Sequence, residues 1–317
     1  MARGTDRLLG TAGGTDEGGR GKRPRNRRHP RLACAADRGR APRQVAGGCA
    51  VNGREAPIGV FDSGFGGLTV MRSLVDQLPN EDFVYLGDTA RAPYGPRPIA
   101  QVREFAIQGL DHLAGRGVKA LVIACNSASS AVLRDARERY DVPILEVILP
   151  AARRALAASG SGRVGVVCTE ATAMSRSYDD AFAVAGNVRL TTQACPRFVE
   201  FVEAGITGGE ELLGVAREYL APLQAANIDT LILGCTHYPL LTGVINYVLG
   251  DDVVLVSSSD ACAQDTYARL TRKGLLHDAP RHASRQFLTT GDADSFQGIG
   301  ERLLGRFVHD VEQVELR

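Results

Sequence analysis

Two cysteines of this 317-residue chain stand where a thiol can do acid–base chemistry. Cys125 and Cys235 each follow a continuous apolar run, and each is followed by polar residues instead of further apolar packing. A lone cysteine is more often an ordinary small core residue. A thiol at a strand end, with a helix starting soon after it, is instead expected to have a lowered pKa. We therefore predict that this pair is reactive.

The remaining cysteines are interpreted as reduced, individually placed residues. Seven cysteines at wide spacing in a chain of this size do not indicate a disulfide scaffold, and no CxxC pair indicates a zinc ribbon or a thioredoxin-type redox site. The five others are Cys34, Cys49, Cys168, Cys195 and Cys262.

Asp62 and His237 are the titratable residues best placed to help a thiol. Asp62 ends the first apolar run, where it could be solvated, cap a helix or shuttle a proton for a nearby cysteine. His237 comes two residues after Cys235, so orienting the thiol or transferring its proton is favoured over an ordinary satisfied histidine.

Two glycine-containing loops are candidates for ligand contacts. Residues 61–67, Phe-Asp-Ser-Gly-Phe-Gly-Gly, allow close backbone approach but lack both the GK[S/T] ending of a P-loop and the GxGxxG spacing. A ligand carboxylate therefore fits this loop better than a nucleotide. The segment Pro-Tyr-Gly-Pro at 93–96 is either a surface turn or a cleft wall with backbone donors at Tyr94 and Gly95.

The sequence predicts neither a metal site nor a cofactor. It contains no HExxH motif and no close His/Cys/Asp cluster. Pyridoxal phosphate requires a Schiff-base lysine, and none of the three lysines, Lys22, Lys119 and Lys273, lies in a glycine-rich phosphate context.

The elements that must position these residues alternate along the chain from Pro57 onward. Short β-branched runs followed by helical stretches predict βαβ units, a mainly parallel sheet and the α/β class. Strands are expected at 58–61, 83–86, 118–124, 144–147, 164–167, 188–192, 230–233, 253–256 and near Phe287, and helices at 68–78, 99–113, 129–140, 173–185, 210–225 and 261–270.

The pattern restarts halfway, which indicates an internal duplication. Residues 58–63 align with 164–169, and residues 119–126 align with 229–236, so that Cys125 and Cys235 take equivalent positions. Ligands of open parallel sheets bind at the carboxyl ends of the strands, where both cysteines fall. We expect two similar α/β domains, each with helices flanking its sheet, that direct both thiols into one cleft.

The expected domains are residues 57–148 together with 257–317, and residues 149–256. Residues 1–56 carry 13 Lys and Arg against 5 Asp and Glu and have no apolar period, so we expect a disordered basic extension. An over-called start, with translation beginning at Val51, is the interpretation we favour. The basic run at 20–31 has no aromatic residue to stack a base, so nucleic-acid binding is not expected.

We expect a cytoplasmic protein. No run of about eighteen apolar residues predicts a membrane-spanning helix, and the basic N-terminus is not followed by the apolar stretch of a secretory signal.

Four motifs, in this order, together resemble one known family. They are Asp-Ser-Gly at 62–64, Gly-Asp-Thr-Ala-Arg-Ala-Pro-Tyr-Gly at 87–95, Cys-Asn-Ser-Ala at 125–128 and Gly-Cys-Thr-His-Tyr-Pro at 234–239. Each motif alone is weak evidence, but the four motifs together are specific for one family. From about residue 57 to 300 the chain resembles the bacterial glutamate racemases of the aspartate/glutamate racemase family.

The resemblance implies an isomerase that interconverts L- and D-glutamate without a cofactor and supplies D-glutamate for peptidoglycan and cell shape. Cys125 and Cys235 would remove and deliver the α-proton on opposite faces. Asp62 would assist Cys125, and His237 and Glu203 would assist Cys235. Substrate contacts would fall on Asp62, Ser63, Tyr94, Gly95, Asn126, Ser127, Thr169, Thr172, Thr236 and His237.

Alternatives remain open at this stage. A related two-cysteine racemase would act on aspartate or a hydantoin. A binding protein would act on a macromolecular partner such as DNA gyrase, which some family members are reported to bind. Dimers are common in the family, so a homodimer is a further expectation. Ser127 stands where many members have threonine, and Cys168 where glycine or another small residue is expected.

Overall fold

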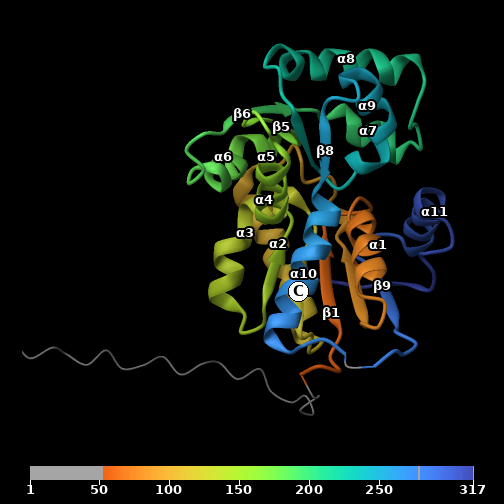
Figure 1. Cartoon of the computed structure of the whole chain (residues 1–317). Coiled ribbons are helices and arrows are strands. Elements are labelled where there is room, and N and C mark those ends of the chain that lie inside the picture. Colours follow the sequence, from red (N-terminus) through yellow and green to blue (C-terminus); the bar gives the residue numbers. More distant parts are fainter. Residues whose placement is uncertain (1–52, 278, 317) are drawn as a thin grey trace, which may run out of the picture. The chain divides into compact units, whose positions relative to one another are not determined.

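The computed structural model describes residues 53–277 and 279–316, which form two parallel sheets flanked by helices (Figure 1). The predicted fold class is thereby confirmed. Sheet A has the order β10-β9-β2-β1-β3-β4 and sheet B the order β6-β5-β7-β8. Their strands are β1 (Ile58–Asp62), β2 (Phe83–Gly87), β3 (Ala120–Ile123), β4 (Ile144–Glu146), β9 (Arg285–Thr289) and β10 (Val311–Gln313) in sheet A, and β5 (Arg163–Cys168), β6 (Arg189–Ala194), β7 (Thr230–Gly234) and β8 (Val254–Ser257) in sheet B.

The two sheets repeat one strand order, as the aligned sequence segments predict. In sheet A, β1 pairs with β2 and β3, and β3 pairs with β4; in sheet B, β5 pairs with β6 and β7, and β7 pairs with β8. Cys125 follows β3 and Cys235 follows β7, so the two thiols lie at the carboxyl ends of equivalent strands. β9 and β10 extend sheet A alone.

The helices lie against both faces of the sheets. In β1, Ile58 and Val60 point into one apolar cluster, and Phe61 points into another, so this strand is buried on both faces. The helices are α1 (Leu68–Gln77), α2 (Ile99–Gly115), α3 (Asn126–Arg139), α4 (Ile148–Ala158), α5 (Glu170–Ser175), α6 (Ser177–Phe182), α7 (Arg197–Glu203), α8 (Glu210–Ala225), α9 (Thr242–Leu249), α10 (Ser258–Lys273) and α11 (Ala293–Leu304).

The structure corrects several predicted elements. The single helix expected at 173–185 is wrong: α5 and α6 are separated by Arg176, whose positive φ of 56° cannot continue a helix. α3 begins at Asn126 and not at Ser129, because Cys125 caps it. α4, α7, α9, α11 and β10 were not predicted from the sequence.

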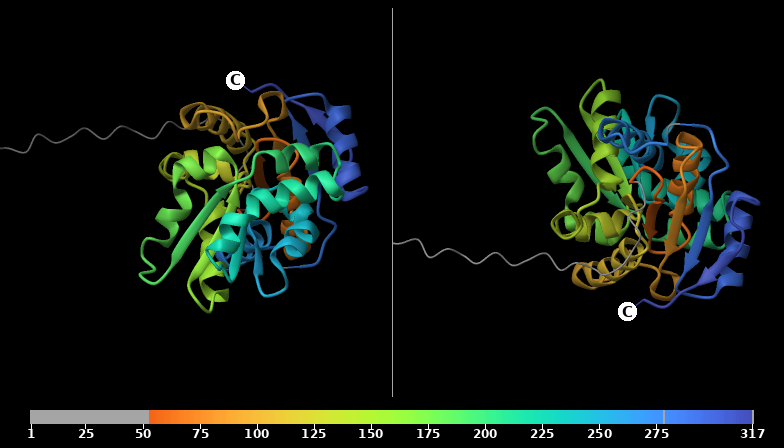
Figure 2. Two further views of the ribbon diagram at one scale, coloured as in Figure 1. Left: turned by 90° about the horizontal axis from the view of Figure 1, so that it is seen from above. Right: turned by 90° about the horizontal axis from the view of Figure 1, so that it is seen from below.

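The C-terminal segment returns to the first sheet. β9 pairs in parallel with β2 along its whole length, and Figures 1 and 2 show this blue segment beside the orange first strands. The strands of sheet A thus come from 58–146 and 285–313, and those of sheet B from 163–257. We propose domain boundaries of 57–148 with 257–317, and 149–256.

The first described residues already pack against the fold. Ala56 is buried, and Arg54 Nε donates to Gly274 O at 2.8 Å, so these two residues of the expected extension 1–56 pack against the folded part of the chain. The basic run at 20–31, Val51, Cys34 and Cys49 lie outside the described residues. In the described part of the chain, no helix combines the length and apolar character needed to cross a membrane.

A buried ion pair joins the segments that precede β2 and β3, at the amino-terminal ends of these strands. Lys119 Nζ contacts the Glu81 carboxylate and donates to Arg54 O at 2.6 Å, and Glu81 Oε1 accepts from His277 N at 2.8 Å. Both side chains are almost fully buried.

Candidate active site

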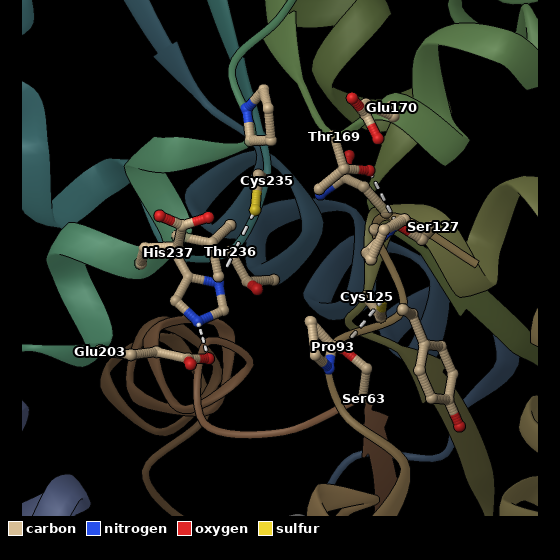
Figure 3. A pocket seen from close by; sticks show the side chains of 17 residues that line it. Ser63, Pro93, Cys125, Ser127, Thr169, Glu170, Glu203, Cys235, Thr236 and His237 are labelled. Carbon is tan, nitrogen blue, oxygen red and sulfur yellow. Dashed lines mark hydrogen bonds and ion pairs between the residues drawn. The ribbon is translucent and has the colours of Figure 1, made fainter. Parts of the chain in front are cut away.

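A cavity of about 170 Å³ lies where the carboxyl ends of the two sheets meet, with both thiols in its wall (Figure 3). Of the predicted site residues, Asp62 and Thr172 lie behind the lining and the others are part of it. The lining residues are Ser63, Pro93, Tyr94, Gly95, Pro96, Cys125, Asn126, Ser127, Thr169, Glu170, Pro196, Val199, Glu200, Glu203, Cys235, Thr236 and His237.

Cys125 is held as the N-cap of α3. Its Sγ accepts from Ala128 N at 3.4 Å and donates to Ser63 Oγ at 3.5 Å. Burial and the nearby Asp62 charge raise the pKa of this thiol to about 12, and its hydrogen bonds with Ser63 and Ala128 only partly oppose them. The predicted lowering by the helix terminus is therefore wrong for Cys125, which is a thiol at neutral pH.

Asp62 lies fully buried at the end of β1, behind the Cys125 side of the cavity. Its Oδ1 accepts from Gly64 N at 2.9 Å, and its Oδ2 has no partner among the described residues. Burial raises the pKa of this carboxyl, although the backbone donors and the His237 charge lower it. Gly67 is required here, because a Cβ at this position would overlap the Asp62 side chain. Asp62 is thus close enough to influence Cys125 without lining the cavity.

Cys235 begins a chain of three polar side chains on the other side of the cavity (Figure 3). Its Sγ lies 3.7 Å from His237 Nδ1, and His237 Nε2 lies 3.1 Å from Glu203 Oε1. Burial alone would lower the pKa of His237, but the hydrogen bonds and charges of Cys235 and Glu203 raise it to about 10. A protonated imidazole is therefore favoured beside Cys235 at neutral pH.

This raised pKa predicts a pH-dependent stability. Native His237 keeps its proton up to about pH 10, whereas the unfolded chain loses it near pH 6.5, so its stabilisation is complete below 6.5 and declines as pH rises toward 10. Denaturant titrations across this window should show the free energy of unfolding of the wild type falling relative to that of His237→Asn. Parallel pH profiles for the two proteins would contradict the raised pKa.

Hydroxyl groups connect the two sides of the cavity. Ser127 Oγ, at the start of α3, lies 2.9 Å from Thr169 Oγ1, and Thr169 Oγ1 donates to Thr172 Oγ1 at 3.0 Å. Thr69 Oγ1 of α1 donates to Thr236 O at 2.8 Å. The Ser127–Thr169 and Thr69–Thr236 bonds each join an element of sheet A to one of sheet B, so the polar lining is held from both sides.

The loop at 93–96 forms one wall, as the functional interpretation of its sequence predicts. The Tyr94 hydroxyl donates to the buried Asp88 carboxylate, which also accepts from Arg91 Nε at 2.7 Å and Thr290 Oγ1 at 2.7 Å. On the other side, Gly95 O accepts from Ala171 N at 2.9 Å. The loop is therefore held in place on one side by the Asp88 carboxylate and on the other by Ala171, which belongs to the sheet B side.

Weakening the contacts between Asp88 and the loop at 93–96 should lower catalytic efficiency. We expect Asp88→Asn, which weakens the charge-assisted bonds to Arg91 and Tyr94, to lower kcat/KM about tenfold to a hundredfold by displacing the wall. Asp82→Asn is the matched control, since Asp82 also accepts several hydrogen bonds but does not line the cavity. Steady-state kinetics showing equal values for both variants would exclude this role.

Sequence reasoning missed part of the lining. Glu170, Pro196, Val199 and Glu200 line the cavity through long-range packing that no local sequence motif indicates. Lys119 is engaged by the Glu81 carboxylate and does not line the cavity. Over residues 53–277 and 279–316, no group of three His, Cys, Asp or Glu is arranged to hold a metal ion.

Comparison with known proteins identifies the family of this chain. The family model described as Asp/Glu/Hydantoin racemase matches residues 58–266, so the chain belongs to that family. A glutamate racemase of Parafrankia sp. is 64% identical over 252 residues, which cover 79% of this chain and 91% of the relative. A Bacillus anthracis glutamate racemase structure matches with TM-score 0.80 and 39% identity, covering 83% of this chain and 98% of that one. A Francisella tularensis glutamate racemase crystallised with D-glutamate matches with TM-score 0.77 and 35% identity over the same shares.

Proposed function

We propose that this protein is a glutamate racemase that interconverts L- and D-glutamate with its own two thiols and no cofactor. The observation that carries the proposal is the placing of Cys125 and Cys235 in one cavity, each at the end of an equivalent strand. Two fixed groups can invert the α-carbon when one removes the α-proton and the other supplies a proton from the opposite face. A duplicated fold that brings its halves together supplies both groups.

A two-thiol mechanism needs one group that gives a proton and one that takes it. In this proposal Cys125, whose pKa burial raises to about 12, gives its proton, and Cys235 takes the α-proton. In this direction the C–H bond breaks toward Cys235, a new C–H bond forms from Cys125, and the two thiols exchange protonation states. The reverse reaction restores them. Asp62 lies close to Cys125, and protonated His237, held by Glu203, lies beside Cys235, so these groups assist the proton transfers of the two thiols through their charges.

Neutral donors stabilise the charge that develops in the substrate. No Arg or Lys of the described chain lines the cavity, whereas Ser63, Ser127, Thr169 and Thr236 do. The amino terminus of the fourteen-residue α3 adds its dipole beside them. We propose that these groups bind the substrate carboxylates and stabilise the carbanion-like transition state.

Circular dichroism of the full chain with L-glutamate, and separately with D-glutamate, tests the proposed function. We expect the signal of either enantiomer to decay to zero without an added cofactor, and L-aspartate to lose little signal under the same conditions. Folded protein that leaves both glutamate signals unchanged would contradict the proposal. Faster loss with aspartate would instead support the related racemase.

The cellular context is part of the proposal. A glutamate racemase of this kind supplies D-glutamate for peptidoglycan in the cytoplasm, and a homodimer is its proposed assembly state. The binding-protein alternative makes a different prediction: a variant without Cys125 and Cys235 thiols would keep the biological effect. Complementation of a D-glutamate-requiring strain by the wild type, but not by that variant, would exclude this alternative.

A further inference from the structure

Tyr178, which does not line the cavity, reaches one of the residues that do. It lies in α6 on the sheet B side, and its hydroxyl donates to Asn126 Oδ1, at the start of α3 on the sheet A side, at 2.9 Å. Both residues are 2% exposed. Asn126 lines the cavity directly after Cys125. This bond therefore joins the two halves of the molecule at a residue next to a reactive thiol.

The Tyr178 hydroxyl keeps its proton under all working conditions. Burial raises the pKa of this hydroxyl well above its ordinary value of 10, and the charges of Cys168 and Glu146 raise it further. The residue therefore remains an uncharged partner for the amide.

The other end of the Asn126 amide lacks a partner. Asn126 Nδ2 is buried and makes no hydrogen bond with any described residue. Buried amide donors are almost always paired in native proteins, so a ligand acceptor is the partner that the cavity can supply. A carboxylate oxygen is such an acceptor.

We propose that Tyr178 is a positioning residue, which turns the Asn126 amide so that its NH₂ group, and not its carbonyl oxygen, meets a carboxylate of the bound amino acid. This inference rests on the proposed function, because it takes a substrate carboxylate as the acceptor. The two ends of an amide carry partial charges of opposite sign. The NH₂ end attracts a carboxylate, and the carbonyl oxygen repels it. Without the hydroxyl of Tyr178, the amide can rotate and present the repelling end.

The same bond makes substrate binding depend on the approach of the two halves. Tyr178 is carried by sheet B and Asn126 by sheet A, so the amide is oriented only while both sides are together. The hydroxyl contact between Ser127 and Thr169 lies at the same boundary. Loss of the Tyr178 hydroxyl should accordingly act on binding more than on the proton transfers.

The test is a double-mutant cycle between Tyr178→Phe and Asn126→Ala. We expect Tyr178→Phe to raise KM for both glutamate enantiomers about threefold to tenfold, the equivalent of one hydrogen bond, with kcat changed less than about twofold. In the Asn126→Ala background the same substitution should leave KM unchanged, because its target is gone. Tyr140→Phe, which removes a hydroxyl bond to Asp111 away from the cavity, should not change KM.

Asn126→Asp gives a second measurement that does not depend on how Tyr178→Phe folds. It preserves the acceptor for Tyr178 but replaces the NH₂ with a carboxylate oxygen, so KM should rise at least about tenfold. Calorimetric titration with glutamate repeats the cycle as a dissociation constant, independent of turnover. A wild type that racemises glutamate while Tyr178→Phe leaves KM unchanged, or raises it equally in both backgrounds, overturns the inference alone. A wild type that neither racemises nor binds glutamate overturns the proposed function and the inference together.

Discussion

Replacing either Cys125 or Cys235 with alanine is expected to lower kcat for glutamate racemisation at least about 10³-fold in both directions. Each turnover needs a proton removed by one thiol and a proton supplied by the other, so the loss of either group stops the overall reaction. Circular dichroism of L- and D-glutamate with each purified variant measures the effect. Both side chains are small, and alanine retains most of the packing, so the variants should remain folded.

The matched control is a buried cysteine outside the cavity. Cys262 in α10 is fully buried and does not line the site, so Cys262→Ala should retain kcat within about twofold while losing some stability. If Cys125→Ala or Cys235→Ala kept more than a tenth of the wild-type kcat, the assignment of two essential thiols would be wrong.

Lys119→Met is expected to lower the free energy of unfolding by about 3–5 kcal/mol. Methionine has a similar length but no charge, so the buried Glu81 carboxylate would lose its counter-ion and keep mainly the His277 backbone donor. The cost of leaving a charge unpaired in a buried site accounts for the size of the effect. Equilibrium denaturation in urea at neutral pH measures it.

Two comparisons make this stability prediction specific. Arg134→Met removes an exposed partner of Glu138, and such surface pairs contribute little, so its effect should stay within about 1 kcal/mol. Replacing both Lys119 with methionine and Glu81 with leucine should recover part of the lost stability, because no unpaired charge remains. A Lys119→Met effect no larger than that of Arg134→Met would contradict the account.

The parts of the fold that could be predicted are those with a local signal. Val122 and Ile123, or Ile232 and Leu233, lie in continuous apolar runs, so their strands are evident without tertiary information. The repeat of these runs also placed Cys125 and Cys235 in equivalent positions, and the observed strand orders reproduce that equivalence. His237 could be predicted as well, because it lies close to Cys235 in the sequence.

The parts that could not be predicted depend on distant residues. The break between α5 and α6 rests on the left-handed conformation of Arg176, a residue type with no special preference for it. The hydrogen bond of Tyr178 to Asn126 joins residues 52 positions apart, which only the folded chain brings together. The direction of the Cys125 pKa was predicted wrongly because the helix terminus is a local feature, whereas burial and the Asp62 charge are tertiary ones.

Racemisation in D₂O tests the two-thiol mechanism most directly. The reaction is started from L-glutamate and, separately, from D-glutamate. Early in each reaction the two enantiomers are separated, and the protium content at the α-carbon of each is measured by proton NMR. Two thiols on opposite faces predict that the new enantiomer carries deuterium, because its proton comes from an exchanged thiol, while the remaining substrate keeps its protium. Product that retains the α-protium of the substrate would mean that a single group carries the proton across, which would contradict the central claim.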